Sequence, residues 1–401
     1  MSLTTTILGG AVQLSANPIR IKISGGIRPA NTSKYKYLFR IISEDGKLYG
    51  APFEEAVAPD VNGEAILDIS GLVDQPIQAI FQYPVTTPYV NYPTQAFNIQ
   101  IQQGESWVDD DDVLHESWGT VSNIFQLLKG GSSPRQLAIW NSLGSSFYQT
   151  YLASKRFLTM RPQGDIVHPT QPVKLWFMPV TNLNCDYNVT GYYDDGTNEE
   201  FETPVSLNVD SLTEFNCNPA HLGLVLEPSG KRMLYFDVCL KENGTRITDL
   251  RNFYFDWRYC ERPYFLLFAN SIGGIDDVFM AGFATEDFTV TSSTMQKPQK
   301  ADATVFEPTL FNTKKEGQNI WSLNTGPKTS TQMLHLRDLI IADQIWILYP
   351  TLDVTTKMII PVNISEFNDT LIDRITNLWS AKIKVSEAHM TGFSFDNRLM
   401  F

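Results

Sequence analysis

The stretch YKYLFRII at residues 35–42 decides the fold of the first part of the chain. Its aromatic and aliphatic side chains at Tyr35, Tyr37, Phe39 and Ile41 occupy every second position. Successive side chains of a β-strand point to opposite faces of its sheet, so this period of two predicts a strand with one buried face.

The same alternation recurs on both sides of this stretch. It occurs in IRIKI (19–23), NGEAILDIS (62–70) and FNIQIQ (97–102), and the pair Asp45-Gly46 predicts a tight hairpin turn after the first strand. Several short strands separated by turn residues are typical of a β-sandwich. We therefore expect a β-sandwich with an N-terminal arm over residues 1–105.

A different pattern follows this region. PRQLAIWNSLGSSFYQTYLASK (134–155) has apolar residues at helical spacing. WGTVSNIFQLLKGG (118–131) fits either a helix that ends at its two glycines or a pair of strands. We expect a partly helical connector here, over residues 106–165.

Aromatic strands dominate the next region. VKLWFM (173–178) alternates, Asp195-Gly196 predicts a hairpin, and MLYFDVCL (233–240) and YFLLFA (264–269) are apolar on both faces. A strand that is apolar on both sides needs a second layer or a partner chain to cover it. The linker SSTMQKPQKADAT (292–304) predicts the end of this domain.

The last region mixes helices and strands. TSTQMLHLRDLIIAD (329–343) predicts a helix that is capped near Ser330, and QIWILY (344–349) predicts a strand. SEFNDTLIDRITNLWS (365–380) predicts a second helix, capped by Ser365. The apolar stripe expected on this helix consists of Phe367, Leu371, Ile375 and Leu378.

Together these patterns predict a mainly β protein. We expect two β-sandwich-like domains joined by a partly helical connector, plus a smaller C-terminal α+β domain. The expected regions are 1–105, 106–165, 166–300 and 301–401.

Charge and composition exclude several kinds of partner. The net charge is −13 and Lys and Arg form no run, which disfavours binding to nucleic acid or to an anionic membrane surface. No apolar stretch approaches the ~18 residues of a membrane span, and the N-terminus lacks the basic segment of a signal peptide. We therefore expect a chain that is made in a cytosol and is kept there or released by lysis.

The cysteines and histidines show no metal-binding pattern. Cys185, Cys217, Cys239 and Cys260 form no C-x-x-C pair, so we expect buried, reduced thiols, with a disulfide or a zinc site as the alternative. The five histidines are scattered along the sequence, at His115, His168, His221, His335 and His389.

The motifs of common enzymes are missing. The sequence contains no G-x-S-x-G, no phosphate-binding loop, no dinucleotide-binding fingerprint and no H-E-x-x-H. Dispersed carboxylates such as Asp194-Asp195 leave a glycoside hydrolase as a remote alternative. We therefore predict no catalytic residue, no cofactor and no metal. The acidic run Asp109–Asp112 predicts a solvated loop, with a calcium loop as the alternative.

One segment resembles a ligand-binding loop, because it combines glycines with polar residues. In ANSIGGIDDVFMAGFA (269–284), Gly273 and Gly274 permit positive φ angles, while Asn270 and Asp276 bring polar side chains to the same place. No helix follows to bind a phosphate at its N-terminus. We therefore predict a structural corner between two strands, formed by Asn270, Gly273, Gly274 and Asp276.

This segment also carries a family resemblance. Residues 270–276 resemble an N-S-[LI]-G-G-x-[DE] signature of structural proteins from tailed phages and prophages of Bacteroidetes. Weaker matches are the G-x-x-x-L-D-[IL]-S element at 63–70, KRFLTMRP at 155–162 and L-N-T-G at 323–326. The resemblance implies a virion part of the tail, baseplate or neck type that is made in the host bacterial cytoplasm and has no catalytic residues.

We therefore expect a structural subunit that acts by oligomeric assembly. Its expected partners are copies of itself in a symmetric ring or sleeve, and other virion structural proteins. The N-terminal arm (1–17) and the Tyr/Pro-rich loop (83–94) are the expected contacts between subunits. The alternative is a receptor- or carbohydrate-binding module, for which Trp107, Trp118 and Tyr192/Tyr193 are the candidate aromatic residues.

Overall fold

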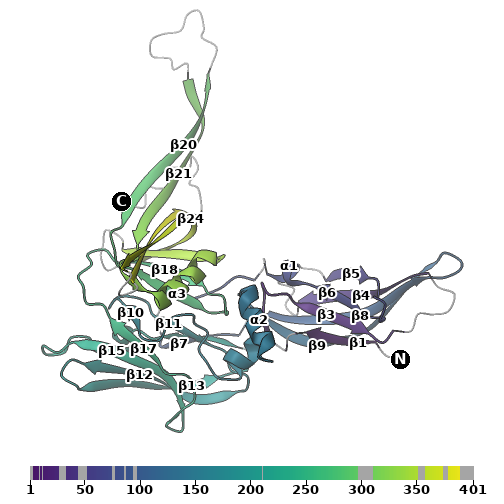
Figure 1. The fold of residues 1–401 in the computed structure, drawn as a ribbon, viewed down its shortest axis with the longest axis horizontal. Coiled ribbons are helices and arrows are strands. Elements are labelled where there is room, and N and C mark those ends of the chain that lie inside the picture. The colour runs from purple at the N-terminus through teal and green to yellow at the C-terminus, as the bar shows by residue number, and fades with distance from the viewer. Residues whose placement is uncertain are drawn as a thin grey trace, which may run out of the picture. The chain divides into compact units, whose positions relative to one another are not determined.

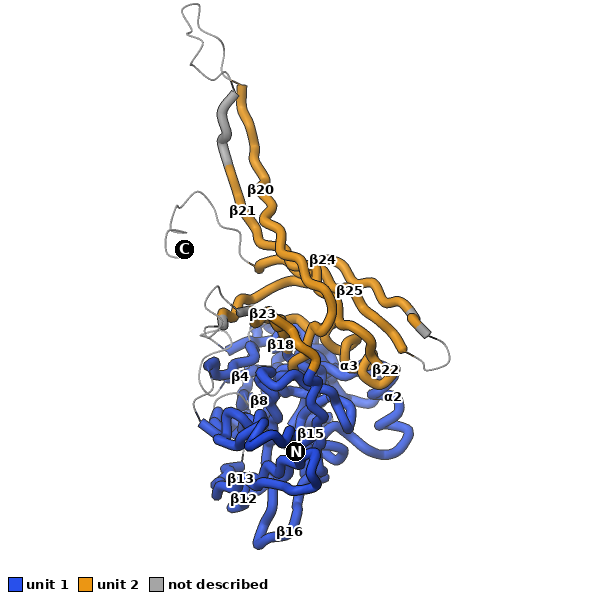
Figure 2. Tube along the Cα trace, turned by 90° about the vertical axis from the view of Figure 1, so that its left-hand side faces the viewer, with its two compact units in different colours: residues 1–257, 269–276 blue, residues 258–268, 277–401 orange. Residues whose placement is uncertain are grey.

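The fold is mainly β, which confirms the expected class. The computed structural model describes residues 3–8, 10, 12–26, 33–43, 52–74, 77–84, 87–93, 97–209, 211–296, 310–350, 357–373 and 378–388. The chain forms two compact units, residues 1–257 with 269–276, and residues 258–268 with 277–401 (Figure 2). The turn expected at Asp45-Gly46 lies outside the described residues.

The first unit begins with two sheets that share one core (Figure 1). One sheet has the order β1 (Thr4–Leu8), β3 (Arg20–Ser24), β6 (Ala65–Asp68). The other has the order β2 (Val12–Leu14), β9 (Leu114–Leu128), β8 (Phe97–Val108), β4 (Ser33–Ser43), β5 (Phe53–Val57). The short helix α1 (Ser70–Val73) follows β6. This arrangement is sandwich-like.

The predicted alternation forms the core of this sandwich. Ile19, Ile21 and Ile23 are fully buried, and they lie in one cluster with Phe39 of β4 and Ile101 of β8. The ambiguous segment 118–131 is a strand over most of its length, because β9 pairs along β8. The first sandwich therefore extends to residue 128, beyond the boundary expected at 105.

The middle of the first unit holds a second pair of sheets around another core. The larger sheet has the order β10 (Asp165–Val167), β17 (Arg251–Phe255), β15 (Met233–Glu242), β12 (Leu183–Tyr193), β13 (Asn198–Leu207), and β16 (Thr245–Arg246) pairs with β15. The smaller sheet has the order β11 (Lys174–Phe177), β14 (Leu212–Asn216), β7 (Tyr89–Tyr92). The hairpin turn at Asp195-Gly196 joins β12 to β13, and Gly196 has a φ of 81°.

Short helices link and flank these sheets. The predicted helical segment forms α2 (Pro134–Ser142), which begins with Ser133 as its N-cap, and a π-helical turn η1 (Tyr148–Leu152). A 3-10 turn η2 (Pro219–Leu222) follows β14. No helix in the described part of the chain is long and apolar enough to cross a membrane.

Strand β7 comes from the Tyr/Pro-rich loop that we expected to contact other subunits. It lies between β6 and β8 in sequence, yet it pairs antiparallel with β14 of the second sandwich. The N-terminal arm likewise forms β1 and β2, which pair with β3 and β9. Strands from both segments therefore pair with other strands of the same chain.

The second unit is built on one large sheet. Its order is β19 (Ile275–Met280), β18 (Tyr264–Ala269), β23 (Ile345–Pro350), β24 (Lys357–Asp373), β25 (Leu378–Glu387), β21 (Leu310–Asn324), β20 (Thr285–Gln296), and β22 (Lys328–Thr329) pairs with β25. The predicted helix is α3 (Ser330–Ile341), whose N-cap is Thr329 in a capping box with Gln332. Strands from 264 to 296 belong to this sheet, so the boundary expected at residue 300 falls inside a domain.

The second helix expected in this region is wrong. Residues 357–373 form strand β24, which pairs with β23 on one side and β25 on the other. Register shifts occur between Ile364 and Glu366 and between Leu371 and Asp373. Each shift interrupts the period of two. The remaining apolar positions then mimic a helical stripe, which explains the error. Ile375 of that stripe lies outside the described residues.

Candidate functional site

The four residues of the predicted corner lie together in the turn from β18 to β19. The side-chain amide of Asn270 closes the turn. Its Oδ1 accepts hydrogen bonds from the backbone N–H groups of Ile272 (3.1 Å) and Gly274 (2.9 Å). The backbone N–H of Asn270 donates to the carbonyl of Gly274 at 2.9 Å. Asn270 therefore satisfies amides that the sharp turn leaves without a strand partner.

Glycine is required at both positions 273 and 274, for different reasons. Gly273 has a φ of 95°, a conformation that side chains with a Cβ rarely adopt. At Gly274 a Cβ would lie 2.1 Å from the carbonyl oxygen of Leu158. That oxygen also accepts a hydrogen bond from Asn270 Nδ2 at 3.0 Å, so the turn approaches residue 158 at backbone level.

Asp276 fastens the other end of the turn. Its Oδ1 accepts a hydrogen bond from Thr159 Oγ1 at 2.7 Å, and its Oδ2 accepts one from the backbone N–H of Met160 at 2.9 Å. The Nε of Arg161 lies 3.9 Å from Oδ1, with both side chains fully buried. The neighbouring carbonyl of Ile275 accepts a hydrogen bond from Trp176 Nε1 at 2.9 Å.

This arrangement leaves no room for a substrate. The cavity beside Gly273 and Gly274 has a volume of about 10 Å³, which is close to the size of a single water. The polar groups of the corner are committed to the 158–161 segment and to Trp176. Its role is therefore structural: it joins the turn to segments that are 99 to 117 residues away in sequence.

A second polar cluster was missed in the sequence. Lys174 of β11 and Glu214 of β14 form an ion pair in which both side chains are only 1% exposed. Lys174 Nζ also donates to the carbonyl of Gln82 at 2.7 Å, and it lies 5.0 Å from the ring centre of Phe81. An isolated lysine in an apolar strand gives no signal of its partner, because the partner is distant in sequence.

The same cluster holds the Tyr/Pro-rich segment in place. The hydroxyl of Tyr92 donates to Glu214 Oε2 at 2.9 Å, and its ring stacks on Trp176 with a centroid distance of 5.6 Å. Burial and the nearby Glu214 carboxylate raise the pKa of Tyr92 above its ordinary value. Tyr92 is therefore a neutral hydrogen-bond donor that fixes β7 to the second sandwich.

The acidic run lies in the turn between β8 and β9. Asp109 Oδ1 accepts hydrogen bonds from the backbone N–H groups of Asp111 (3.0 Å) and Val113 (2.9 Å), and its Oδ2 lies 2.7 Å from His115 Nε2. Hydrogen bonding to His115, followed by the two amides, lowers the pKa of Asp109. No cluster of three or more metal-binding side chains occurs among the described residues. Asp109 acts as the cap of a turn.

The aromatic residues proposed for sugar binding are covered on at least one face. Trp107 stacks on His115 at 5.6 Å, and Arg40 lies 4.0 Å above the ring of Trp118. Tyr192 stacks on Tyr235 at 4.5 Å, whereas Tyr193 is buried in the core of the second sandwich. Sugar platforms expose flat ring faces, and this geometry reduces the area that these rings offer.

No described histidine belongs to a group of three or more side chains that could hold a metal ion. His168 is buried beside Thr170, and His335 is buried 5.3 Å from the ring of Phe268. His389 lies outside the described residues. Cys185, Cys217 and Cys239 are buried thiols that form no disulfide, and Cys260 is half-buried.

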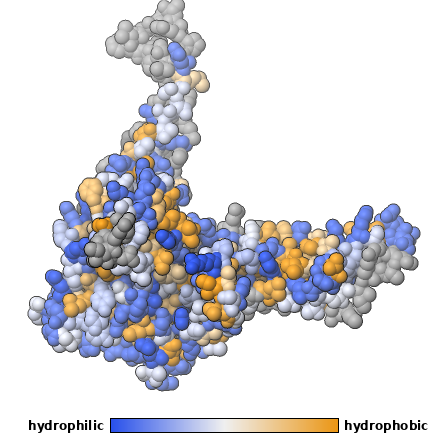
Figure 3. All heavy atoms as spheres, in the orientation of Figure 1, coloured by the Kyte–Doolittle hydropathy of each residue, from blue (hydrophilic) through white to orange (hydrophobic). Residues whose placement is uncertain are grey.

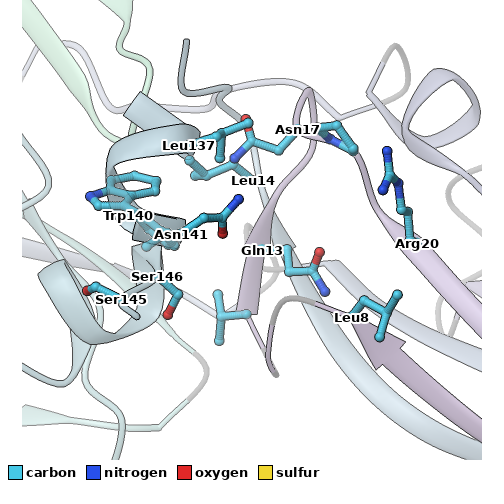
Figure 4. Close-up of a pocket in the computed structure, with 13 residues that line it drawn as sticks. Leu8, Gln13, Leu14, Asn17, Arg20, Leu137, Trp140, Asn141, Ser145 and Ser146 are labelled. Carbon is cyan, nitrogen blue, oxygen red and sulfur yellow. The ribbon is translucent and has the colours of Figure 1, made fainter. Parts of the chain in front are cut away.

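The first unit contains a pocket of ligand size, lined by described residues (Figure 4). Its volume is about 320 Å³, at the lower end of the range for small-molecule sites. Leu14, Leu137 and Trp140 form apolar walls, and Arg20 is the only ionisable side chain in the lining. The serine hydroxyls of its lining have no histidine or carboxylate there, so the pocket lacks the groups for nucleophilic catalysis.

Comparisons with known proteins assign no family. No family model and no curated protein match the sequence. Solved structures do match, among them one titled "Marsupial T cell receptor", which is 8% identical in sequence. That match covers 80% of this chain and 96% of that chain, with a TM-score of 0.18. A likeness of this size carries no argument about function.

Proposed function

We propose that this chain is a structural subunit of a tailed-phage virion, of the tail, baseplate or neck type, and that it acts by oligomeric assembly. The phage origin is supported by the signature at Asn270–Asp276, whose residues all take part in one structural corner. The assembly function is supported by one surface feature, the β20–β21 hairpin.

This hairpin extends beyond the other strands of its own unit (Figures 1 and 2). The ladder between β20 and β21 runs from Thr285 and Ser322 to Gln296 and Leu310, but β21 pairs with β25 only over residues 320–324. Most of the hairpin is therefore a two-stranded ribbon. A two-stranded ribbon is marginally stable in water unless something packs on it.

The side chains of β20 are open to solvent along the whole ribbon. Every residue from Glu286 to Gln296 is exposed, including Phe288 (58%), Val290 (55%) and Met295 (55%). Apolar patches interrupt the polar surface of this ribbon in Figure 3. A long exposed edge that carries apolar side chains can pair with another chain, and exposed apolar patches mark surfaces that other proteins bind. Assembly with other subunits supplies such a cover.

The experiment that tests this proposal uses the source particle. Particles purified from lysed cells should contain the chain, and negative-stain images with a gold-labelled tag should place it at one repeated position. A variant in which a two-residue turn joins Asp287 to Ile320 removes the ribbon and keeps the base of the hairpin. We expect it to fold and to be absent from particles. When the variant is expressed beside the full-length chain, the particles should contain only the full-length chain. Purified source particles that lack the full-length chain, or that take up the variant equally well, would contradict the proposal.

The alternative function is receptor or carbohydrate binding. No contact described above favours it, because the faces of the candidate rings are partly covered by His115, Arg40 and Tyr235. It stays a prediction, and a glycan array with the purified chain tests it. Specific sub-millimolar binding that is lost on replacing Trp118 by Ala would support it.

A further inference from the structure

Strand β20 forms one end of the large sheet of the second unit. The opposite end is β19, whose residues are all buried, whereas β20 is exposed from Glu286 onward. Natural edge strands are usually protected by charged residues, by proline or by bulges. From Phe288 to Gln296 the sequence FTVTSSTMQ contains no charge, no proline and no glycine.

The hairpin contains one register shift, but this shift does not distort the free edge of β20. The register shift after Ser293 arises because Ser293 pairs with Lys314 and Thr294 with Asn312, so the extra residue lies in β21. In β20 itself, successive side chains keep pointing to alternate faces without interruption. An edge of this kind is a template for a further strand, because its backbone groups lie at constant spacing.

The sequence of β20 is complementary to itself. When two copies pair antiparallel about a twofold axis at Thr291, that residue faces its own equivalent. Thr289 then faces Ser293 of the second copy, and Val290 faces Ser292. Cross-strand pairs of hydroxyl residues are favourable, whereas like charges opposite each other are unfavourable. The acidic residues Glu286 and Asp287 fall opposite Gln296 and Met295, so no like charges meet.

We propose that β20 pairs antiparallel with β20 of a second copy of this chain, with the twofold axis at Thr291. This inference rests on the proposed assembly function and names its partner. The pairing joins two large sheets edge to edge and turns each two-stranded ribbon into part of a four-stranded one. It is an isologous contact, in which the same residues contribute from both subunits.

Cysteine crosslinking of the full chain tests whether the twofold axis lies at Thr291. In a Cys260→Ser background, Thr291→Cys should form a covalent dimer under mild oxidation or with a short bismaleimide, because the residue faces itself. Thr285→Cys lies six positions away on the same strand and should not crosslink alone. Thr289→Cys should crosslink only when it is mixed with Ser293→Cys.

A charge variant provides an independent readout. Thr291→Lys places two ammonium groups opposite each other and should weaken the dimer by about tenfold or more in light-scattering measurements. Ser206→Lys adds the same charge at an exposed position of β13, at an edge of another sheet, and should leave the dimer unchanged. Thr291→Val keeps β-propensity and should also preserve it.

The outcomes separate this inference from the proposed function. Crosslinking at Thr291 together with the charge effect supports the β20 pairing. A chain that self-associates or enters particles without either effect overturns the pairing and leaves the assembly function standing. A chain that neither self-associates nor occurs in particles overturns both.

Discussion

The hydroxyl of Thr159 donates a hydrogen bond to the carboxylate of Asp276 at 2.7 Å, across 117 residues of sequence and with both side chains buried. The second oxygen of the same carboxylate accepts the backbone N–H of Met160. The guanidinium of Arg161 lies close by, at 3.9 Å from Asp276 and 3.1 Å from Asp165. One buried guanidinium thus lies near two buried carboxylates, which makes this group sensitive to any change of charge.

Replacing Asp276 by Asn should destabilise the chain strongly. The substitution removes the negative charge that faces Arg161. It also places an NH2 group, which is a donor, opposite the N–H of Met160 or the hydroxyl of Thr159, which are donors as well. Removing one member of a buried ion pair costs about 3–5 kcal/mol. Because Arg161 keeps its second pair with Asp165, we expect a loss of about 3 kcal/mol. The fall in thermal unfolding temperature measures it. Asp110→Asn, at an exposed position in the β8–β9 turn, is the control and should leave that temperature unchanged.

Adding a methyl group at Gly274 should also destabilise the corner. Its Cβ would meet the carbonyl oxygen of Leu158 at 2.1 Å, and backbone atoms on both sides must move. Such overpacking typically costs about 1–3 kcal/mol, and here a hydrogen bond of Asn270 is at risk as well. Gly71→Ala is the matched control, because nothing lies within 4 Å of its Cβ. Equal melting temperatures for the two variants would contradict the close approach at Gly274.

The turn at residues 270–276 is predictable from the sequence, but the segment that it contacts is not. The pair Gly273-Gly274 with flanking Asn270 and Asp276 predicts a sharp turn, because each residue type has a local conformational role. The segment that receives the turn cannot be found this way. Leu158, Thr159 and Met160 bind it largely through backbone groups, which every residue possesses.

Strands with one buried face were predictable, whereas their partners were not. The alternation around Phe39 predicts a strand, but nothing local shows that β7 crosses to the second sandwich and pairs with β14. The helix expected at 365–380 failed because register shifts in β24 disturb the period of two. Tertiary pairing with two neighbouring strands then decides the conformation.

The buried pair of Lys174 and Glu214 should behave as a unit. Lys174→Met leaves the carboxylate of Glu214 buried without its cation, which should cost about 3–5 kcal/mol. Adding Glu214→Leu to that variant removes the buried charge, so the double variant should be more stable than Lys174→Met alone. Urea unfolding of the unsubstituted chain, the two single variants and the double variant gives the coupling energy. Additive effects of the two substitutions would contradict an ion pair.

The thiols should differ in reactivity. Burial, followed by the carboxylates of Asp186 and Glu242, raises the pKa of Cys185 to about 11, and burial raises the pKa of Cys239. A pKa raised in the folded state stabilises the fold below the ordinary value of 9, and this contribution disappears as the pH rises from 9 through 11. At pH ~8 a thiol reagent should therefore label Cys260 first. The other three should react only after unfolding, and rapid labelling of Cys185 in the folded chain would contradict this burial.

The turn at Asp109 should depend on its carboxylate and not on calcium. Its Oδ1 accepts the N–H groups of Asp111 and Val113, and its Oδ2 faces His115, so a metal ion would have to displace these contacts. Asp109→Ala should speed amide hydrogen exchange at residues 111 and 113, because both N–H groups lose their acceptor. Asp110→Ala should not. Calorimetric titration with calcium should show no binding at millimolar concentration. A binding signal that disappears in Asp109→Ala would establish the calcium loop instead.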